Sequence, residues 1–258
     1  MTETVFAVGT SGPTVAVIAV VAVIVGYFAA RSIVAEANAH RLGRDDNWWN
    51  PECEECDDSL DVPLRKCRFA GHTQRVANVW IILATMAVFA LVAISVESAW
   101  VLPAYIWFAY FSLLLTVTDL DTKLIPNRIL LPATVGGVAL LGLGALIDGD
   151  FEGLLRALLA GLAYFVVMLI LGLIARGALG FGDVKLAFFL GLFVGYLGWG
   201  HLIVSGLGSF LLGGVVALIL VITKKASRKD AIPFGPFMTI AAIATVVAGS
   251  AFLDWYLG

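Results

Sequence analysis

The segment YIWFAYFSLLLTVTDLDTKLIPN, residues 105–127, decides the fold class, because an apolar run long enough for a membrane helix ends in two carboxylates. Asp119 and Asp121 follow the run, and Pro126 and Asn127 favour the start of a new helix. We therefore expect a membrane-spanning helix to reach water near residue 118 and the chain to turn back into the bilayer. Carboxylates are frequent at such boundaries, so this segment alone assigns them no chemistry.

The composition of the whole chain also indicates a membrane protein. Of its 258 residues, 60% are hydrophobic and 14% are charged, and the mean hydropathy is +0.97. Soluble domains have an apolar share of roughly 45–50%. At about 20 apolar residues a span, the length accommodates on the order of eight transmembrane helices. The predicted fold class is an all-α polytopic membrane protein, with a small cytoplasmic, cysteine-containing insert after the first helix.

The apolar segments predict where the spans lie. The first lacks a basic leading region and a small-residue cleavage site, so we expect it to be retained. The chain then divides into a first transmembrane helix (1–34), an insert (35–76) too short to bury a core without a staple, and a seven-helix membrane core (77–258). The expected spans are 14–34, 77–97, 100–118, 129–147, 155–175, 184–198, 201–222 and 236–257.

The distribution of basic residues predicts the orientation. All sixteen lysines and arginines except Arg156 fall on one side of the alternating topology. By the positive-inside rule this side is cytoplasmic, and the N-terminus lies outside. Asp119, the later GFGD sequence at 180–183 and the insert then all face the cytoplasm. We expect a multi-pass protein of the inner or cytoplasmic membrane.

A further carboxylate, Asp183, stands at the entrance of the short apolar segment 184–198. Gly180 and Gly182 precede it, and they allow a sharp turn and the close approach of another helix. The simplest interpretation of Asp183 is a helix cap. Asp119 and Asp183 become informative together, because both lie at helix ends on the same membrane face, one helical hairpin apart. Asp121, two residues after Asp119, points to a different face of the helix.

Two carboxyl groups brought side by side have a specific chemical use. They cannot both ionise without repulsion, so the pair shares a proton. The ionised member can take a proton from a water that attacks a peptide carbonyl, while the protonated member hydrogen-bonds to the developing oxyanion and helps to protonate the leaving amine. Such hydrolysis needs neither a metal nor a covalent intermediate. A site at the membrane edge suits a substrate in which a polar leader meets an apolar helix.

Three sequence elements carry a resemblance to a known family. The pattern Asp-apolar-x-x-x-x-Ile-Pro-Asn at 119–127, the pattern Gly-x-Gly-Asp-apolar-Lys at 180–185 and IPFGPFM at 232–238 resemble the type IV prepilin peptidases, the A24-type membrane aspartyl proteases. The resemblance covers most of residues 100–258. It implies that Asp119 and Asp183 are the two catalytic aspartates and that proteolysis needs no cofactor. It also implies type IV prepilin or pseudopilin precursors as partners, with no nucleic acid; the oligomeric state is not implied.

Residues next to these aspartates are candidates for a supporting role. Gly180 and Gly182 allow close backbone approach. Pro126 and Asn127 belong to the matching Ile-Pro-Asn element. For Lys185 two interpretations stay open: it extends to the membrane interface, or it lowers a carboxylate pKa or holds the substrate backbone.

The insert contains a cluster of metal-ligand residue types. Cys53 and Cys56 form a CxxC pair, followed by Cys67 and His72. Cytoplasmic thiols stay reduced, so metal binding is favoured over a disulfide, and a structural zinc site needs four ligands. Bacterial prepilin peptidases typically carry two CxxC pairs here, whereas this chain has Ala70 in place of the fourth cysteine. Either His72 completes a Cys3His zinc site or the insert packs without metal.

The resemblance leaves one further activity and two other functions to consider. Bacterial family members often methylate the new N-terminus with S-adenosylmethionine, but the exit of the first span only loosely resembles the family's Gly-Ser-Phe-Leu-Asn element, so methylation stays open. An ion-coupled transporter with paired aspartates would place them near the bilayer midplane, often in repeated halves. A presenilin-like protease shares the GxGD element, but Ile-Pro-Asn and PFGP favour the prepilin-processing type.

Overall fold

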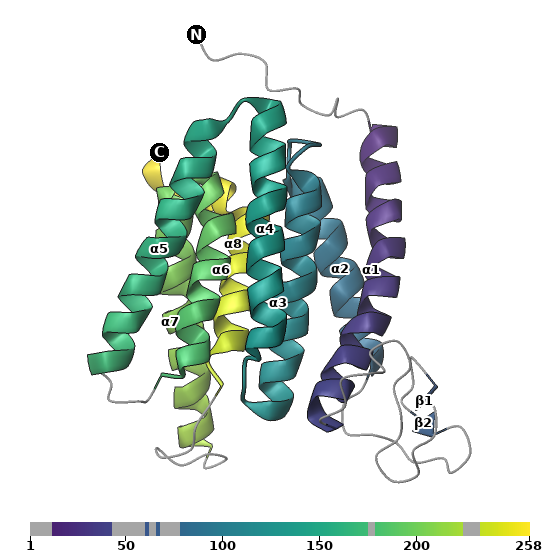
Figure 1. Ribbon diagram of the computed structural model, residues 1–258, viewed down its shortest axis with the longest axis vertical. Coiled ribbons are helices and arrows are strands. Elements are labelled where there is room, and N and C mark those ends of the chain that lie inside the picture. Colours follow the sequence, from purple (N-terminus) through teal and green to yellow (C-terminus); the bar gives the residue numbers. More distant parts are fainter. Residues whose placement is uncertain (1–11, 43–59, 62–65, 68–77, 175–178, 224–232) are drawn as a thin grey trace. The chain divides into compact units, whose positions relative to one another are not determined.

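The computed structural model describes residues 12–42, 60–61, 66–67, 78–174, 179–223 and 233–258 (Figure 1). Two short antiparallel strands, β1 (Leu60–Asp61) and β2 (Lys66–Cys67), pair Leu60 with Cys67. The rest of this described part is almost entirely helical. Its helices are α1 (Gly12–Leu42), α2 (Asn78–Ser95), α3 (Leu102–Thr122), α4 (Asn127–Asp148), α5 (Phe151–Ile174), α6 (Phe181–Leu197), α7 (Trp199–Ile222) and α8 (Gly235–Leu257).

Five of these helices, α3, α4, α5, α7 and α8, are long and apolar enough to cross a membrane. Shorter apolar stretches lie in α1 (Val17–Ala30) and α2 (Ile81–Ser95), and α6 has 17 residues. The helical architecture agrees with the predicted polytopic membrane protein. A total of eight spans stays a prediction.

The chain forms two compact units. One extends from residue 9 to residue 94 and contains α1, β1, β2 and all but the last residue of α2; the other contains residues 95–258 with α3 to α8. Helix α1 continues to Leu42, beyond the predicted end of the first span at residue 34, because no helix-breaking residue interrupts 35–42. Within the first unit, α1 approaches α2 closely at Gly26, where an added Cβ would lie 3.0 Å from Cα of Met86.

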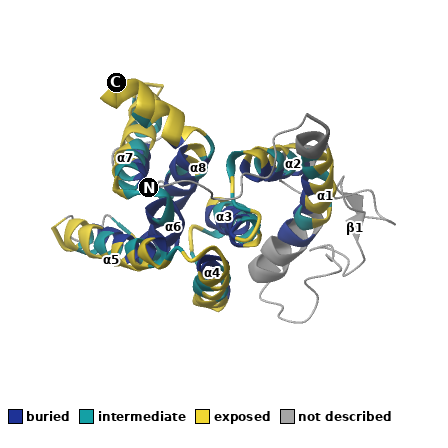
Figure 2. Ribbon diagram, turned by 90° about the horizontal axis from the view of Figure 1, so that it is seen from above, coloured by how far each residue is buried: buried dark blue, intermediate teal, exposed yellow. Residues whose placement is uncertain are grey.

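In the second unit α6 lies in the middle, with α3, α4, α5, α7 and α8 around it (Figure 2). Most of its residues are buried, including Phe189 and Phe193. These two rings pack against Tyr105 and Phe108 of α3, with 4.8 Å between the ring centroids of Phe108 and Phe193. The Tyr105 hydroxyl donates a hydrogen bond to the Phe193 carbonyl at 2.8 Å. This aromatic cluster holds α3 against α6, the two helices that carry the candidate aspartates.

Small residues bring α6 close to α5. A Cβ added to Gly191 would lie 2.8 Å from Cα of Gly161, and one added to Gly195 would overlap the Cβ of Ala160. Helices with small residues at their interface can pack with their backbones in near contact. The position of α6 is therefore determined on two sides, by aromatic packing against α3 and by backbone contact with α5.

Candidate functional site

Asp119 lies in the last turn of α3, which continues to Thr122 and not only to the predicted boundary at residue 118. The helix ends at Lys123, whose backbone has a positive φ of 54° and whose N–H donates to the Asp119 carbonyl at 2.8 Å. The Asp119 side chain is only 4% exposed. Its Oδ2 atom makes no hydrogen bond to any described residue. Asp119 is thus a buried carboxyl group, one of whose oxygens has no hydrogen-bond partner in the described part of the chain.

Asp183 lies in the first turn of α6 and is 8% exposed. Its Oδ2 accepts a hydrogen bond from the Gly180 backbone N–H at 3.2 Å, while the Asp183 N–H donates to the Gly180 carbonyl at 3.0 Å. Asp183, the third residue of α6, therefore bonds back to the backbone N–H of the N-cap residue, so it contributes to capping its helix as the simplest interpretation of the sequence expected. Capping occupies one oxygen of the carboxylate, so it does not exclude a second role.

The two aspartates come together at Gly235, the first residue of α8. Asp183 interacts electrostatically with Asp119, and the Gly235 backbone amide faces both carboxyl groups. A Cβ added to Gly235 would lie 2.7 Å from Asp119 Oδ2, so a larger residue would displace the carboxylate. In the sequence the Pro-Phe-Gly-Pro element signals only the resemblance, and nothing in it predicts this contact.

Ile125 lies in the same cluster, between the first turns of α6 and α8. A Cβ on Gly182 would lie 3.0 Å from the Cβ of Ile125, and a Cβ on Gly235 would lie 3.3 Å from its Cδ1. The predicted close approach at Gly182 is therefore present, and a side chain of the loop after α3 fills the space. The three sequence elements that carry the resemblance thus meet at one end of the second unit.

The other candidate residues are placed around this cluster. Gly180, which is exposed, is the N-cap of α6, and Pro126 is the N-cap of α4, so Asn127 begins that helix as predicted. Asp121 is only half-buried, in contrast to Asp119. The difference in burial follows from their offset of two residues on a helix.

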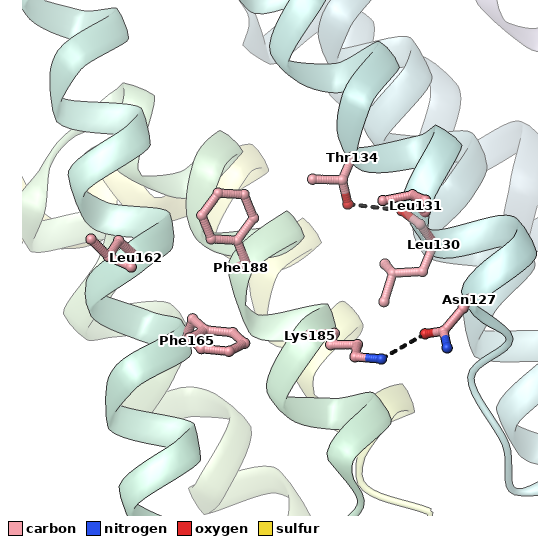
Figure 3. A pocket seen from close by; sticks show the side chains of 8 residues that line it. All are labelled: Asn127, Leu130, Leu131, Thr134, Leu162, Phe165, Lys185 and Phe188. Carbon is pink, nitrogen blue, oxygen red and sulfur yellow. Dashed lines mark hydrogen bonds between the residues drawn. The ribbon is translucent and has the colours of Figure 1, made fainter.

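Lys185 reaches across to α4. Its Nζ donates a hydrogen bond to Oδ1 of Asn127 at 2.9 Å and lies 4.8 Å from the ring centroid of Phe181. The two residues form one end of a pocket of about 560 Å³ between α4, α5 and α6 (Figure 3). The residues lining it are Asn127, Leu130, Leu131, Thr134, Leu162, Phe165, Lys185 and Phe188.

Hydroxyl groups connect α3 to α8 next to Asp119. Thr116 Oγ1 and Thr239 Oγ1 are 2.5 Å apart, and Thr239 also donates to the Gly235 carbonyl at 3.1 Å. Thr116 and Asp119 are three residues apart and so lie on the same face of α3. This hydroxyl pair holds the helix that carries Asp119 next to the helix that begins at Gly235.

The predicted zinc ligands all belong to the insert. Cys53, Cys56 and His72 lie outside the described residues, and Cys67 is described only through the backbone of β2. Among the residues that the structure describes, no group of three or more His, Cys, Asp or Glu side chains could hold a metal ion. The zinc site stays a prediction.

Comparisons with known proteins agree with the motif resemblance. Residues 106–218, which include both aspartates, match the type IV leader peptidase family. The prepilin leader peptidase/N-methyltransferase of Aeromonas salmonicida is 29% identical over 178 residues, or 68% of this chain and 59% of the relative. The enzyme of the same name from Legionella pneumophila is 33% identical over 150 residues, which cover 56% of this chain and 49% of the relative. The one from Bacillus subtilis is 28% identical over 192 residues, which cover 74% of each chain.

The match to the Aeromonas and Legionella relatives thus spans only about half to three fifths of their length. No solved structure matches the chain significantly. The predicted resemblance to the prepilin-processing family is confirmed by these findings, which favour it over the presenilin-like and transporter alternatives.

Proposed function

Taking as the premise that this chain is related to the type IV leader peptidases through residues 106–218, we propose that it is a membrane aspartyl endopeptidase. Its substrates are type IV prepilin or pseudopilin precursors, from which it removes the leader peptide. The relatives named as prepilin leader peptidases support this substrate class. The cleavage takes place at the cytoplasmic face of the inner membrane, the face on which the basic residues gather.

One observation carries the proposal: two buried carboxyl groups from different helices interact beside the same backbone amide. Buried polar groups normally have hydrogen-bond partners, and exceptions in native structures often have functional reasons. The unpartnered Asp119 Oδ2 is such an exception. It is the acceptor that a substrate water would use.

The chemistry follows from a proton shared between Asp119 and Asp183. The ionised carboxylate accepts a proton from the attacking water, and the other carboxylic acid donates a hydrogen bond to the scissile carbonyl. The tetrahedral intermediate then collapses when the leaving amine is protonated by the carboxyl group that took up the water proton. The backbone N–H groups of Gly180 and Gly235 hold the carboxylates in place throughout the reaction, because backbone donors do not have to reorient during it.

Cleavage of a precursor in reconstituted membranes tests the proposal. The full chain is incorporated in proteoliposomes with a precursor that has a basic leader and an apolar helix, and leader removal is followed on a gel. We expect Asp119→Asn and Asp183→Asn each to lower kcat by about a thousandfold, because each removes a general acid or base. Asp121→Asn is the matched control and retains substantial activity. Cleavage at the wild-type rate by either of the first two variants would contradict the two-aspartate mechanism.

Methylation of the new N-terminus is not part of the proposal. The names of the relatives include an N-methyltransferase activity, but the family match in this chain begins only at residue 106. The residues at the exit of the first span depart from the family's usual element, as the sequence indicates. The proposal therefore rests on the peptidase alone.

A further inference from the structure

The pocket between α4, α5 and α6 is open and largely apolar. Helices α4 and α5 are joined at one end and spread apart toward the other, with α6 behind the space between them (Figure 1). Leu131 of α4 and Leu162 of α5 are exposed on its two sides, and Phe188 of α6 lies between them (Figure 3). The proposed cleavage chemistry uses none of these side chains. We call this pocket the α4–α5 groove.

The polar end of the α4–α5 groove lies at the end of α6 that carries Asp183, on a different face of that helix. Lys185 follows Asp183 by two residues in the first turn of α6, and Asn127 follows Ile125, whose side chain contacts the aspartate cluster, by two residues. The Lys185 ammonium donates to the neutral amide of Asn127, and no carboxylate of the described part pairs with it. This end of the groove thus presents an ammonium group that can donate a hydrogen bond to a carbonyl of an occupant.

We infer that the α4–α5 groove holds the first two turns of the substrate's apolar helix, next to the scissile bond. The inference rests on the proposed function, because the occupant is the helix that a prepilin-like precursor presents after its leader. The residues lining the groove on α4, at positions 127, 130, 131 and 134, follow the i, i+3, i+4, i+7 pattern of one helix face. They span about 10 Å, or two helical turns, at a rise of 1.5 Å per residue.

The shape of the groove favours a helix in this place. Two spread helices with a third behind them form the kind of groove into which the side-chain ridges of another helix pack. Lys185 then donates to an acceptor of the substrate chain beside the cleavage site, where the polar leader meets the helix. A lipid acyl chain or a second copy of the chain could also cover the apolar walls, but neither accounts for a groove that ends in the same turn of α6 as Asp183.

Photo-crosslinking identifies the occupant. A photo-reactive phenylalanine analogue replaces either Leu131, which lines the groove and is 67% exposed, or Val135, which is 62% exposed one turn later on α4 and does not line it. In proteoliposomes that contain the precursor, we expect precursor adducts at position 131 and at least tenfold fewer at 135. Adducts with lipid or with a second copy of the chain alone, or equal adducts at both positions, would overturn the inference.

Filling the groove gives a kinetic test with its own control. Thr134→Trp narrows the groove, and Val135→Trp adds the same bulk beside it. Each variant is assayed on the full precursor and on a short soluble peptide that contains only the cleavage site. We expect Thr134→Trp to lower the ratio of kcat/KM for the precursor to kcat/KM for the peptide at least tenfold, and Val135→Trp to leave this ratio at the wild-type value. Equal ratios for both variants would reject the groove as the helix site.

The wild-type protein separates the two levels of the proposal in the same vesicles. If wild type does not cleave the precursor, the proposed function fails. If wild type cleaves the precursor but position 131 gives no precursor adduct and Thr134→Trp keeps the wild-type ratio, the cleavage function stands and the groove assignment fails.

Discussion

The two ends of α6 differ in whether their polar groups have hydrogen-bond partners. At the C-terminal end, Arg156 of α5 donates through Nε to the Gly195 carbonyl at 3.0 Å and through Nη2 to the Tyr196 carbonyl at 2.5 Å. Last-turn carbonyls have no partner within the helix, so this arginine satisfies groups that would otherwise be orphaned. At the N-terminal end, Asp183 stands beside Asp119, one of whose oxygens has no partner in the described part.

This difference separates what stabilises the helix from what the chemistry requires. Leaving a buried polar group without a hydrogen bond costs about 1–3 kcal/mol. In the described residues, three buried side-chain atoms are in this position, and Asp119 Oδ2 is the one that belongs to an ionisable group. One end of α6 is therefore anchored, and the other keeps an unsatisfied acceptor where the proposed mechanism places the attacking water.

The strongest test of the N-terminal end of α6, where the two aspartates meet, is the substitution Gly235→Ala. Its Cβ would lie 2.7 Å from Asp119 Oδ2, so the carboxylate must move. Because displacement of a catalytic group by about 1 Å can cost about a hundredfold in rate, we expect that loss in kcat for precursor cleavage. Gly214→Ala is the control, since nothing lies within 4 Å of its added Cβ. Wild-type kcat in Gly235→Ala protein would show that the aspartate geometry is not critical.

A change at the C-terminal end of α6, which Arg156 anchors, should alter the stability of the protein. Arg156→Met removes two charge-assisted hydrogen bonds to the end of α6, and we expect the free energy of unfolding to fall by about 1.5–3 kcal/mol. The melting temperature in detergent measures this change. Arg156→Lys should recover part of the loss, because an ammonium still donates to one carbonyl. The opposite result would be an unchanged melting temperature together with a strong loss of cleavage, measured at a temperature at which the variant is folded. That result would show that Arg156 serves the chemistry and not the stability of α6.

The substitution Lys185→Met tests a second residue at the N-terminal end of α6. It keeps the length of the side chain and removes the charge that the α4–α5 groove offers to the substrate. We expect a roughly tenfold increase in KM for the precursor, equivalent to about 1.4 kcal/mol, with a smaller change in kcat. Steady-state cleavage at several precursor concentrations separates the two constants. An unchanged KM would leave Lys185 with its simpler role of joining α6 to Asn127.

The smallest expected effect belongs to the hydroxyl pair that joins α3 to α8. Thr239→Val keeps the shape of the side chain and removes its hydrogen bond to Thr116. Hydrogen bonds between membrane helices contribute about 0.6 kcal/mol on average, so we expect a small loss of thermal stability. Thr245→Val is matched to it, because Thr245 bonds only to the Ala241 carbonyl of its own helix. Identical melting temperatures for the two variants would show that the interhelical bond is not stabilising.

Much of the architecture could be predicted because its signals are local. The apolar run at 105–117 predicted α3, and Pro126 with Asn127 predicted the start of α4, since span length and turn residues act within a few positions. The predicted end near residue 118 was too early. Helix α3 continues through Asp119 to Thr122, because the change from apolar to polar residues marks a change of environment and not the end of the hydrogen-bonded helix.

The candidate site was only partly predictable, because sequence signals are local and the site depends on contacts between helices. The spacing of polar residues predicted Asp119 and Asp183 at helix ends on the same membrane face, and in the structure the two carboxyl groups interact electrostatically. Their catalytic role stays a proposal. Gly235 appeared in the sequence only as part of a motif, because a glycine's importance depends on which side chain approaches it.

The sequence by itself determined that this chain has apolar helices, where most of them begin and end, and which carboxylates lie at their ends. These features follow from residue composition and spacing over one or two turns. Only the tertiary structure decided that Asp119 Oδ2 is buried without a partner among the described residues, that Gly235 faces both aspartates, and that Lys185 closes one end of a groove. Those contacts depend on how each helix is rotated and how closely it packs, which is determined by all its neighbours together.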